Sequence, residues 1–437
     1  MNRKLTFAWF LLGLGSQLQV VFSLSISEVL VLIVAPFLVV SEIQHMRRHG
    51  VLPFFYMAVL LFLGCIVSLI ANHAQSYQAV RGVSITVVVL CMVVVGHYML
   101  RTDPDGLKWY FWGAMLSGFI CIFVFQKSVE VYSARGADVE SIIAGPTFWI
   151  QRLGSIFTTP ILAYYLKIPL AYSFAASLLL AIFSIMTSAS GRAASLAFIG
   201  AAAIVILGRK KRKSMMSLGR HFILVLCSAI VGIFTIKAVY QWAALNNYLG
   251  EKARAKYEHQ TAGGSGIIKL LIGGRADAFV GLLAIAEAPV LGKGYWAPDT
   301  EDYYEMFLAK YGTPDDYDEY MKWSGLRMSM GMRNIPCHSH ITSFWLWFGL
   351  PGLLFWLYVI YVILRYLKND APAVPQWFYW LAAGSPGIIW HVFFSPFNAR
   401  VGLPLYVVGM LIARAVRLGK YQLPFKMIRE IDEAERR

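Results

Sequence analysis

Long apolar runs recur along almost the whole chain, separated by short polar connections. Most are about 17 to 25 residues long, the length that an α-helix needs to cross a bilayer core of about 30 Å. They predict membrane spans near residues 5–22, 26–42, 52–72, 82–100, 108–126, 153–166, 170–187, 193–208, 222–240, 341–365, 378–394 and 403–415. The pattern therefore predicts an all-α polytopic integral membrane protein with about twelve transmembrane helices. The first run follows "MNRK" without a small-residue cleavage site, which favours a span over a signal peptide.

One long polar interval, residues 241–340, interrupts this pattern between the ninth and tenth runs. A structureless connection of that length is uncommon, so we expect it to carry its own helices. "GGRADAFVGLLAIAEAPVLGKGYW" reads as a helix between glycines at its start and a proline and glycines at its end. The acidic and aromatic segment 299–325 is expected to face water, with Tyr303, Tyr304 and Trp323 as candidate faces for stacking on sugar.

The chain accordingly divides into four parts: spans 1 to 9 in 1–240, a large loop domain in 241–340, spans 10 to 12 in 341–415, and a basic tail in 416–437. Hydrophobic residues make up 58% and charged residues 14% of the chain, against about 45–50% and about 25% in soluble domains.

Basic residues predict the orientation. If both termini are cytoplasmic, Arg47 and Arg48, the cluster "GRKKRK" and the tail from Arg414 all lie inside. The long loop then faces the external (periplasmic) side of the membrane. The net charge of +15 follows from this asymmetry and favours anionic membrane lipids as partners, not nucleic acid.

Cysteine usage gives no further site. Four of the five cysteines fall within spans, and Cys337 lies outside them. There is neither a disulfide framework nor a zinc-ligand spacing, and no HExxH pattern accompanies the histidines. The sequence predicts neither a metal nor a cofactor.

Three segments on the predicted outer side place a basic residue at the start of a helix. These are Arg192, after Ser190, in "SASGRAASLAF"; Arg275 in "GGRADAF"; and His338, beside His340, in "CHSHITSFW". Helix starts expose N–H groups and a partial positive charge, and an arginine fork matches phosphate oxygens. If the three starts share one cavity, they predict a pyrophosphate site. Each residue alone is more typical of an interfacial anchor, so the hypothesis depends on the combination; His391 and Arg400 are weaker candidates for the same cavity.

In this order, "TSASGRAASLAFIG", "GGRADAFVGLLAIAEAPVLGKGYW" and "HSHITSFWLWFGLPGLL" resemble three signatures of the bacterial O-antigen ligase and polymerase superfamily. In that family a Ser/Gly-Arg stretch opens a membrane helix, and a loop helix begins with Arg and ends in Pro-x-x-Gly-x-Gly. A His-Asn-x-x-Leu segment then precedes a Gly-x-Pro-Gly turn. This chain departs from the family pattern at Gly191, Ser339 and Thr342, where Ser, Asn and Leu are common, and His340 is additional.

The resemblance implies a metal-independent glycosyltransferase that acts at the periplasmic membrane face. Its donor would be a glycan on undecaprenyl or another polyprenyl pyrophosphate, and its acceptor lipid A–core oligosaccharide. By motif, Arg192 and Arg275 would bind the pyrophosphate, and His338 would act as general base or position the donor. A single dominant outer loop favours an O-antigen ligase, with an O-antigen or exopolysaccharide polymerase as the alternative.

A transporter or flippase of lipid-linked oligosaccharides is the alternative from a different class. Transporters bury ionisable groups near the middle of the bilayer. The predicted spans carry almost no charge at mid-depth, which favours surface chemistry.

Overall fold

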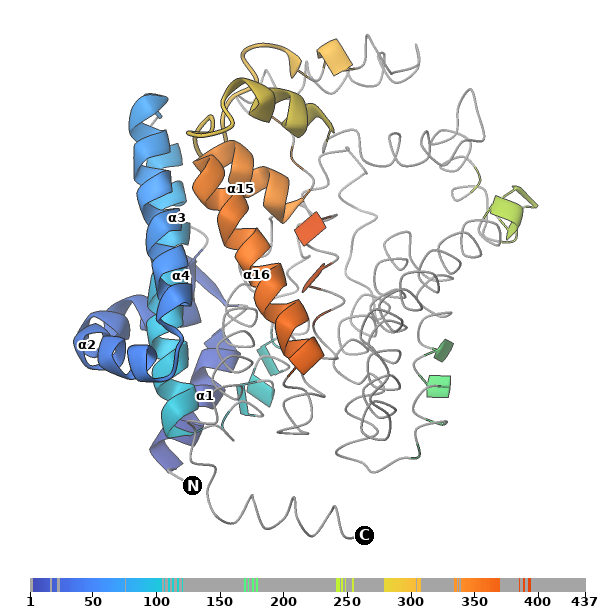
Figure 1. Cartoon of the computed structure of the whole chain (residues 1–437). Helices are drawn as coiled ribbons and strands as arrows, with labels where there is room; N and C mark the ends of the chain where they lie inside the picture. Colours follow the sequence, from blue (N-terminus) through green and yellow to red (C-terminus); the bar gives the residue numbers. More distant parts are fainter. Residues whose placement is uncertain are drawn as a thin grey trace.

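The structure is a computed structural model of the whole chain. It describes, in full or in part, residues 3–15, 18–21, 24–74, 76–103, 106–120, 169–179, 241–254, 279–303, 305–307, 334–335, 337, 339–369 and 385–393. The described residues are mostly helical (Figure 1).

The chain begins with helix α1 (Arg3–Gly15), a short antiparallel hairpin of β1 (Gln19–Val21) and β2 (Leu24–Ser25), and helix α2 (Ile26–Arg48). The sequence pattern predicted one span over 5–22, and this prediction is wrong because α1 ends at Gly15. A Cβ atom on Gly15 would lie 2.9 Å from the backbone nitrogen of Ser27, so only glycine allows α1 to approach the start of α2 this closely. Thirteen residues span about 20 Å of helix, less than a bilayer core.

Helix α2 has a complete capping box at its first turn. The hydroxyl of Ser25 accepts a hydrogen bond from the amide of Glu28, and the carboxylate of Glu28 accepts one from the amide of Ser25. The first charged residue of the predicted second span therefore fixes the start of a helix. Arg47 and Arg48 lie in the last turn, where cations interact favourably with the helix dipole.

Helices α3 (Leu52–Ala71) and α4 (Ser76–Thr102) run side by side (Figure 1). Within the described part of the chain, three helices are long and apolar enough to cross a membrane, namely Ile26–Arg48, Leu52–Ala71 and Gln78–Thr102. They match the predicted spans 26–42, 52–72 and 82–100 and support membrane character for the chain. We call the end of α3 and α4 near Ala71 and Ser76 the loop end, and the end near Arg48 and Thr102 the basic end.

The tenth predicted span, 341–365, is broken into α15 (His340–Phe348) and α16 (Leu350–Asn369), which corrects the prediction of one continuous helix. The break is at Gly349, whose φ of 66° and ψ of −151° suit only glycine. After it, α16 packs back against α15: the rings of Phe344 and Phe355 stack at 6.3 Å, and a Cβ on Gly352 would lie 2.5 Å from the carbonyl carbon of Phe344. Helix α16 also lies beside α3.

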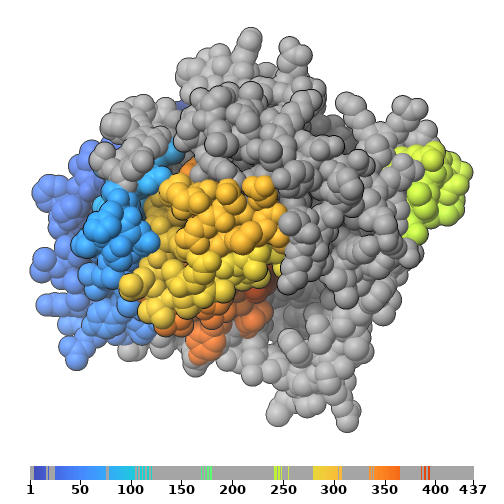
Figure 2. Space-filling model, turned by 90° about the horizontal axis from the view of Figure 1, so that it is seen from above, coloured from blue at the N-terminus to red at the C-terminus, as the bar shows by residue number. Residues whose placement is uncertain are grey.

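The other predicted spans, the 416–437 tail and most of the loop lie outside the described residues or are described only in fragments. Within the loop, residues 279–287 are helical, as the glycine and proline pattern predicted. Seen from the loop end, the yellow surface of this loop segment lies directly against the blue surface of α3 and α4 (Figure 2).

Candidate functional site at the loop end

Backbone hydrogen bonds join the loop to the turn between α15 and α16. The amide of Lys293 donates to the carbonyl of Leu346 at 2.6 Å, and the amide of Leu350 donates to the carbonyl of Val290 at 2.9 Å. We call this contact between residues 288–296 and residues 345–350 the loop clasp. It joins the Pro-x-x-Gly-x-Gly segment to the Gly-x-Pro-Gly turn, two of the three segments singled out in the sequence.

Two glycines allow the loop clasp to close. Gly292 and Gly349 face each other, and a Cβ atom on Gly292 would lie 2.6 Å from the amide nitrogen of Gly349. A Cβ atom on Gly349 would overlap the carbonyl group of Val290, with its carbon only 2.5 Å away. Both glycines also have positive φ, 72° and 66°. Glycine at these two positions is therefore required twice, by backbone conformation and by space.

Polar side chains of α3 and α4 hold the same region. Asn72 Nδ2 donates to the carbonyl of Gly292 at 3.0 Å, and Ser68 Oγ donates to the carbonyl of Trp347 at 2.7 Å. From the start of α4, Gln78 Nε2 donates to the carbonyl of Trp296 at 3.1 Å, and the guanidinium of Arg81 lies 5.5 Å from the centre of the Trp296 ring. These contacts come from residues far apart in the sequence, so they fix the loop relative to the helices.

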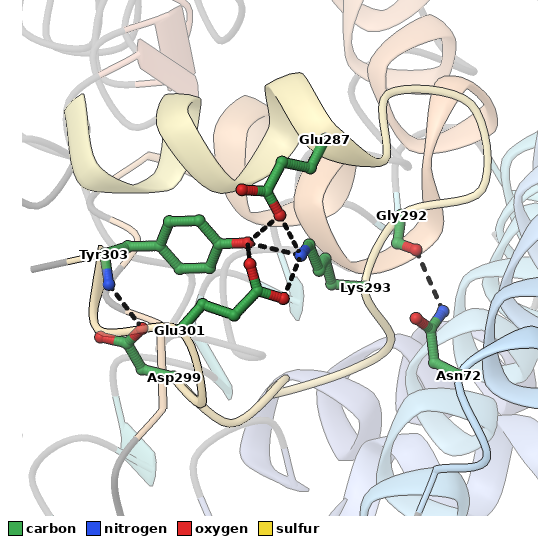
Figure 3. A network of polar contacts seen from close by, with 7 residues as sticks. All are labelled: Asn72, Glu287, Gly292, Lys293, Asp299, Glu301 and Tyr303. Atoms are coloured by element: carbon green, nitrogen blue, oxygen red, sulfur yellow. Dashed lines mark hydrogen bonds and ion pairs between the residues drawn. The ribbon is translucent and has the colours of Figure 1, made fainter. Parts of the chain in front are cut away.

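A network of four side chains ties the loop clasp to the next part of the loop (Figure 3). The ammonium of Lys293 donates to Glu287 at 2.6 Å, to Glu301 at 3.2 Å and to the phenol of Tyr303. The phenol hydroxyl donates to Glu287 and lies 2.7 Å from Glu301. Asp299 accepts a hydrogen bond from the amide of Tyr303 at 3.0 Å and so fixes the backbone of this turn.

The network is exposed at its carboxylates and buried at its ring. The side chains of Glu287 and Glu301 are 46% and 50% exposed, whereas Tyr303 as a whole is 2% exposed. Burial and the two neighbouring carboxylates raise the pKa of the Tyr303 phenol, and the hydrogen bond from Lys293 lowers the pKa of Glu287. The expectation that Tyr303 offers a face for sugar stacking is wrong, because its ring is packed inside the loop.

His340 occupies the first turn of α15 and is almost fully buried, with 3% of its surface exposed. Its ring lies 5.1 Å from the ring of Trp356 in α16. The preceding residue, Ser339, caps the helix: its hydroxyl accepts a hydrogen bond from the amide of Thr342 at 3.0 Å. The predicted helix start is therefore confirmed, and it is held in place by contact with α16.

The remaining predicted site residues lie outside the described residues. These are Ser190, Arg192, Arg275, His338, His391 and Arg400. Their convergence on one cavity stays a prediction. Within the described part of the chain, no group of three or more histidine, cysteine, aspartate or glutamate residues has a geometry that could hold a metal ion.

Sequence reasoning missed a buried polar cluster at the basic end. Glu42 Oε2 lies 2.6 Å from His97 Nδ1, Glu42 Oε1 lies 2.6 Å from an Arg101 nitrogen, and His97 Nε2 lies 2.9 Å from His49 Nδ1. The spacing of His97 and Arg101 by four residues places both on one face of α4, and this was the available signal. The partner on α2 is not recognisable without the packing of the two helices.

No family model matches the chain, and no curated protein matches it.

Proposed function

We propose that this chain is a membrane glycosyltransferase of the O-antigen ligase type. In this proposal it transfers a glycan from polyprenyl pyrophosphate to lipid A–core oligosaccharide on the periplasmic side of the bacterial inner membrane. The loop clasp is the observation that supports it most. Two segments resembling the superfamily's signatures are about 60 residues apart in sequence, and backbone hydrogen bonds and paired glycines hold them together.

The proposed mechanism assigns one role to each basic residue. Arg192 and Arg275 bind the pyrophosphate and stabilise the negative charge that grows on it as the bond between sugar and phosphate oxygen breaks. His338 accepts the proton of the acceptor hydroxyl as that oxygen forms the new glycosidic bond. His340 has a positioning role, because its buried ring holds the start of α15 against Trp356. No metal or cofactor takes part.

The test is transfer by purified protein in liposomes that contain a polyprenyl-pyrophosphate glycan, with and without lipid A–core. The products are sized by gel electrophoresis and mass spectrometry, and a chelator is present in parallel samples. We expect glycan on lipid A–core, unaffected by the chelator and lost in His338→Ala and Arg192→Ala. Arg135→Ala is the matched control, because Arg135 lies between the fifth and sixth predicted spans, on the predicted outer side, and outside the three segments.

Two other outcomes identify the alternatives. Longer lipid-linked chains in the absence of lipid A–core identify a polymerase of the same superfamily. Movement of the lipid-linked glycan between leaflets without any transfer identifies a transporter or flippase. Within the described part of the chain, the buried cluster of Glu42, His97 and Arg101 favours this last class, since transporters bury ionisable groups within membrane helices.

A further inference from the structure

A chain of polar groups crosses from α4 to α2 at the basic end of the bundle. It runs from Arg101 through Glu42 and His97 to His49. The side chains of Glu42 and His97 are fully buried, and that of Arg101 is 26% exposed. His97 is about 30 Å along α4 from the loop clasp, so this cluster lies apart from the proposed glycosyltransferase site.

The hydrogen-bond partners determine where the protons are. His97 Nδ1 faces the Glu42 carboxylate, which only accepts, so this nitrogen carries a proton. His97 Nε2 and His49 Nδ1 face each other at 2.9 Å, and a hydrogen bond between two ring nitrogens needs one proton between them. When both rings are neutral, that proton is on His49 Nδ1 and is donated to His97.

We propose that Glu42, His97 and His49 form a proton-binding relay at the basic end of the bundle, from the turn after α2 to the buried face of α4. A proton from water binds to Nε2 of His49. The bond from His49 Nδ1 to its own proton then breaks, and that proton binds to Nε2 of His97. The products are a neutral His49 in its other tautomer and an imidazolium at His97 beside the Glu42 carboxylate. One proton is taken up, and no other reactant is needed.

The surroundings of His49 disfavour a positive charge on its ring. Burial, followed by repulsion from His97, His45 and Arg101, lowers the pKa of His49 to about 4, and Glu42 opposes this only partly. His45 and His49 come from the end of α2 and Arg101 from α4, while α3 carries no acidic or basic residue. A charge on His49 is therefore disfavoured, and in this proposal the proton moves on to His97 because the Glu42 carboxylate lies 2.6 Å from His97 Nδ1.

A fixed salt bridge does not account for the whole arrangement. Arg101 alone already neutralises Glu42, and both groups are in contact at 2.6 Å. The second histidine adds nothing to that neutralisation, yet it extends the polar chain from the buried pair to the partly exposed turn after α2. Chains of carboxylates and histidines within membrane helices are typical of proton pathways.

The test follows the ring nitrogens of both histidines by NMR. Protein with nitrogen-15-labelled histidine is reconstituted in lipid nanodiscs and titrated from about pH 8 to about pH 5. His49→Gln and His97→Gln variants assign the signals. We expect one imidazolium to form at His97 while His49 changes tautomer at the same pH. Formation of an imidazolium at His49 with His97 unchanged, or no change in either ring, would overturn the relay and leave a fixed salt bridge.

Glu42→Gln is the decisive variant, because it retains the shape of the side chain and removes the charge beside His97. We expect proton uptake to move to more acidic pH by at least about one unit. Glu28→Gln is the matched control, since Glu28 is another buried glutamate of α2 and glutamine preserves its capping box. Equal shifts in both variants would overturn the proposal. If Glu42→Gln does not fold, His49→Gln provides the test. The rate of proton uptake from bulk water at His97 should fall at least tenfold, and an unchanged rate would overturn the relay.

Discussion

Replacing Gly349 by alanine tests the loop clasp at the point where two backbones come closest. The new methyl group would overlap the carbonyl group of Val290 and lie 2.7 Å from the carbonyl carbon of Leu291. Backbone atoms cannot rotate away as a flexible side chain does, so the loop has to move. The movement breaks the hydrogen bond between the Leu350 amide and the Val290 carbonyl.

The size of the effect follows from two contributions. A non-glycine residue at φ 66° and ψ −151° costs about 1–3 kcal/mol. The displaced loop also loses the backbone hydrogen bonds at Lys293 and Leu350, each worth about 1 kcal/mol and more where a buried group stays unpaired. We expect Gly349→Ala to destabilise the closed clasp by about 3–5 kcal/mol.

Hydrogen exchange measured by mass spectrometry in nanodiscs reports this directly. A loss of about 3–5 kcal/mol raises the opening equilibrium by about 10²- to 10⁴-fold, and the amides of Lys293 and Leu350 should exchange faster by that factor. Gly294→Ala is the control, because Gly294 also has positive φ, 89°, but its added Cβ would meet nothing closer than 3.7 Å. That control should show only the smaller conformational cost. Wild-type protection in Gly349→Ala, or equal damage by both variants, would refute the reasoning.

Three further predictions concern the same end of the molecule. Ser339→Ala removes the cap of α15 and should cost about 1 kcal/mol, seen as about fivefold faster exchange in the first turn; unchanged exchange would contradict the cap. Tyr303→Phe removes a buried hydroxyl between two carboxylates and should loosen residues 299–303 by about 1 kcal/mol while protection in α3 stays as in wild type. The four-residue network should also respond to pH in both directions. Burial lowers the pKa of Lys293, but the hydrogen bonds to Glu287 and Glu301 outweigh burial, so the pKa of Lys293 is raised in the folded protein. The contribution of Lys293 to the stability of the loop is therefore complete below about pH 10.4 and is lost as the pH rises through the pKa of the folded state. The pKa of Glu287 is lowered in the folded protein, so its contribution to the stability of the loop is complete above about pH 4.3 and is lost as the pH falls through the folded pKa. Amide protection factors of the loop that stay constant from acid to alkaline pH would contradict the predictions for Lys293 and Glu287.

Local patterns predicted several elements well. The apolar runs gave the starts of α2 and α3 at Ile26 and Leu52, because a long hydrophobic stretch bounded by polar residues has few structures available in a membrane. The glycine, proline and glycine order of the loop indicated a helix that ends before a proline, and the structure has helix over 279–287, before Pro289. These features depend on neighbouring residues alone.

Hydropathy failed where a glycine changes the direction of the chain. The first run ends as a helix at Gly15, before the more polar residues 16–19, and the tenth is broken at Gly349, although apolar residues continue past Gly349. An apolar residue is equally suited to a straight span and to a helix that folds back. The packing of Gly15 against Ser27, and of Gly349 against Val290, selects the second structure.

Length and hydrophobicity along the chain indicated a membrane protein and predicted the helices α2, α3 and α4, because these features depend on neighbouring residues alone. The basic residues proposed to bind a pyrophosphate stay a prediction. The folded structure adds three contacts: the two glycine segments join in the loop clasp, Tyr303 is buried, and Glu42 contacts His97. Each of these contacts depends on a residue far away in the sequence. A local sequence pattern cannot show which distant residues pack together.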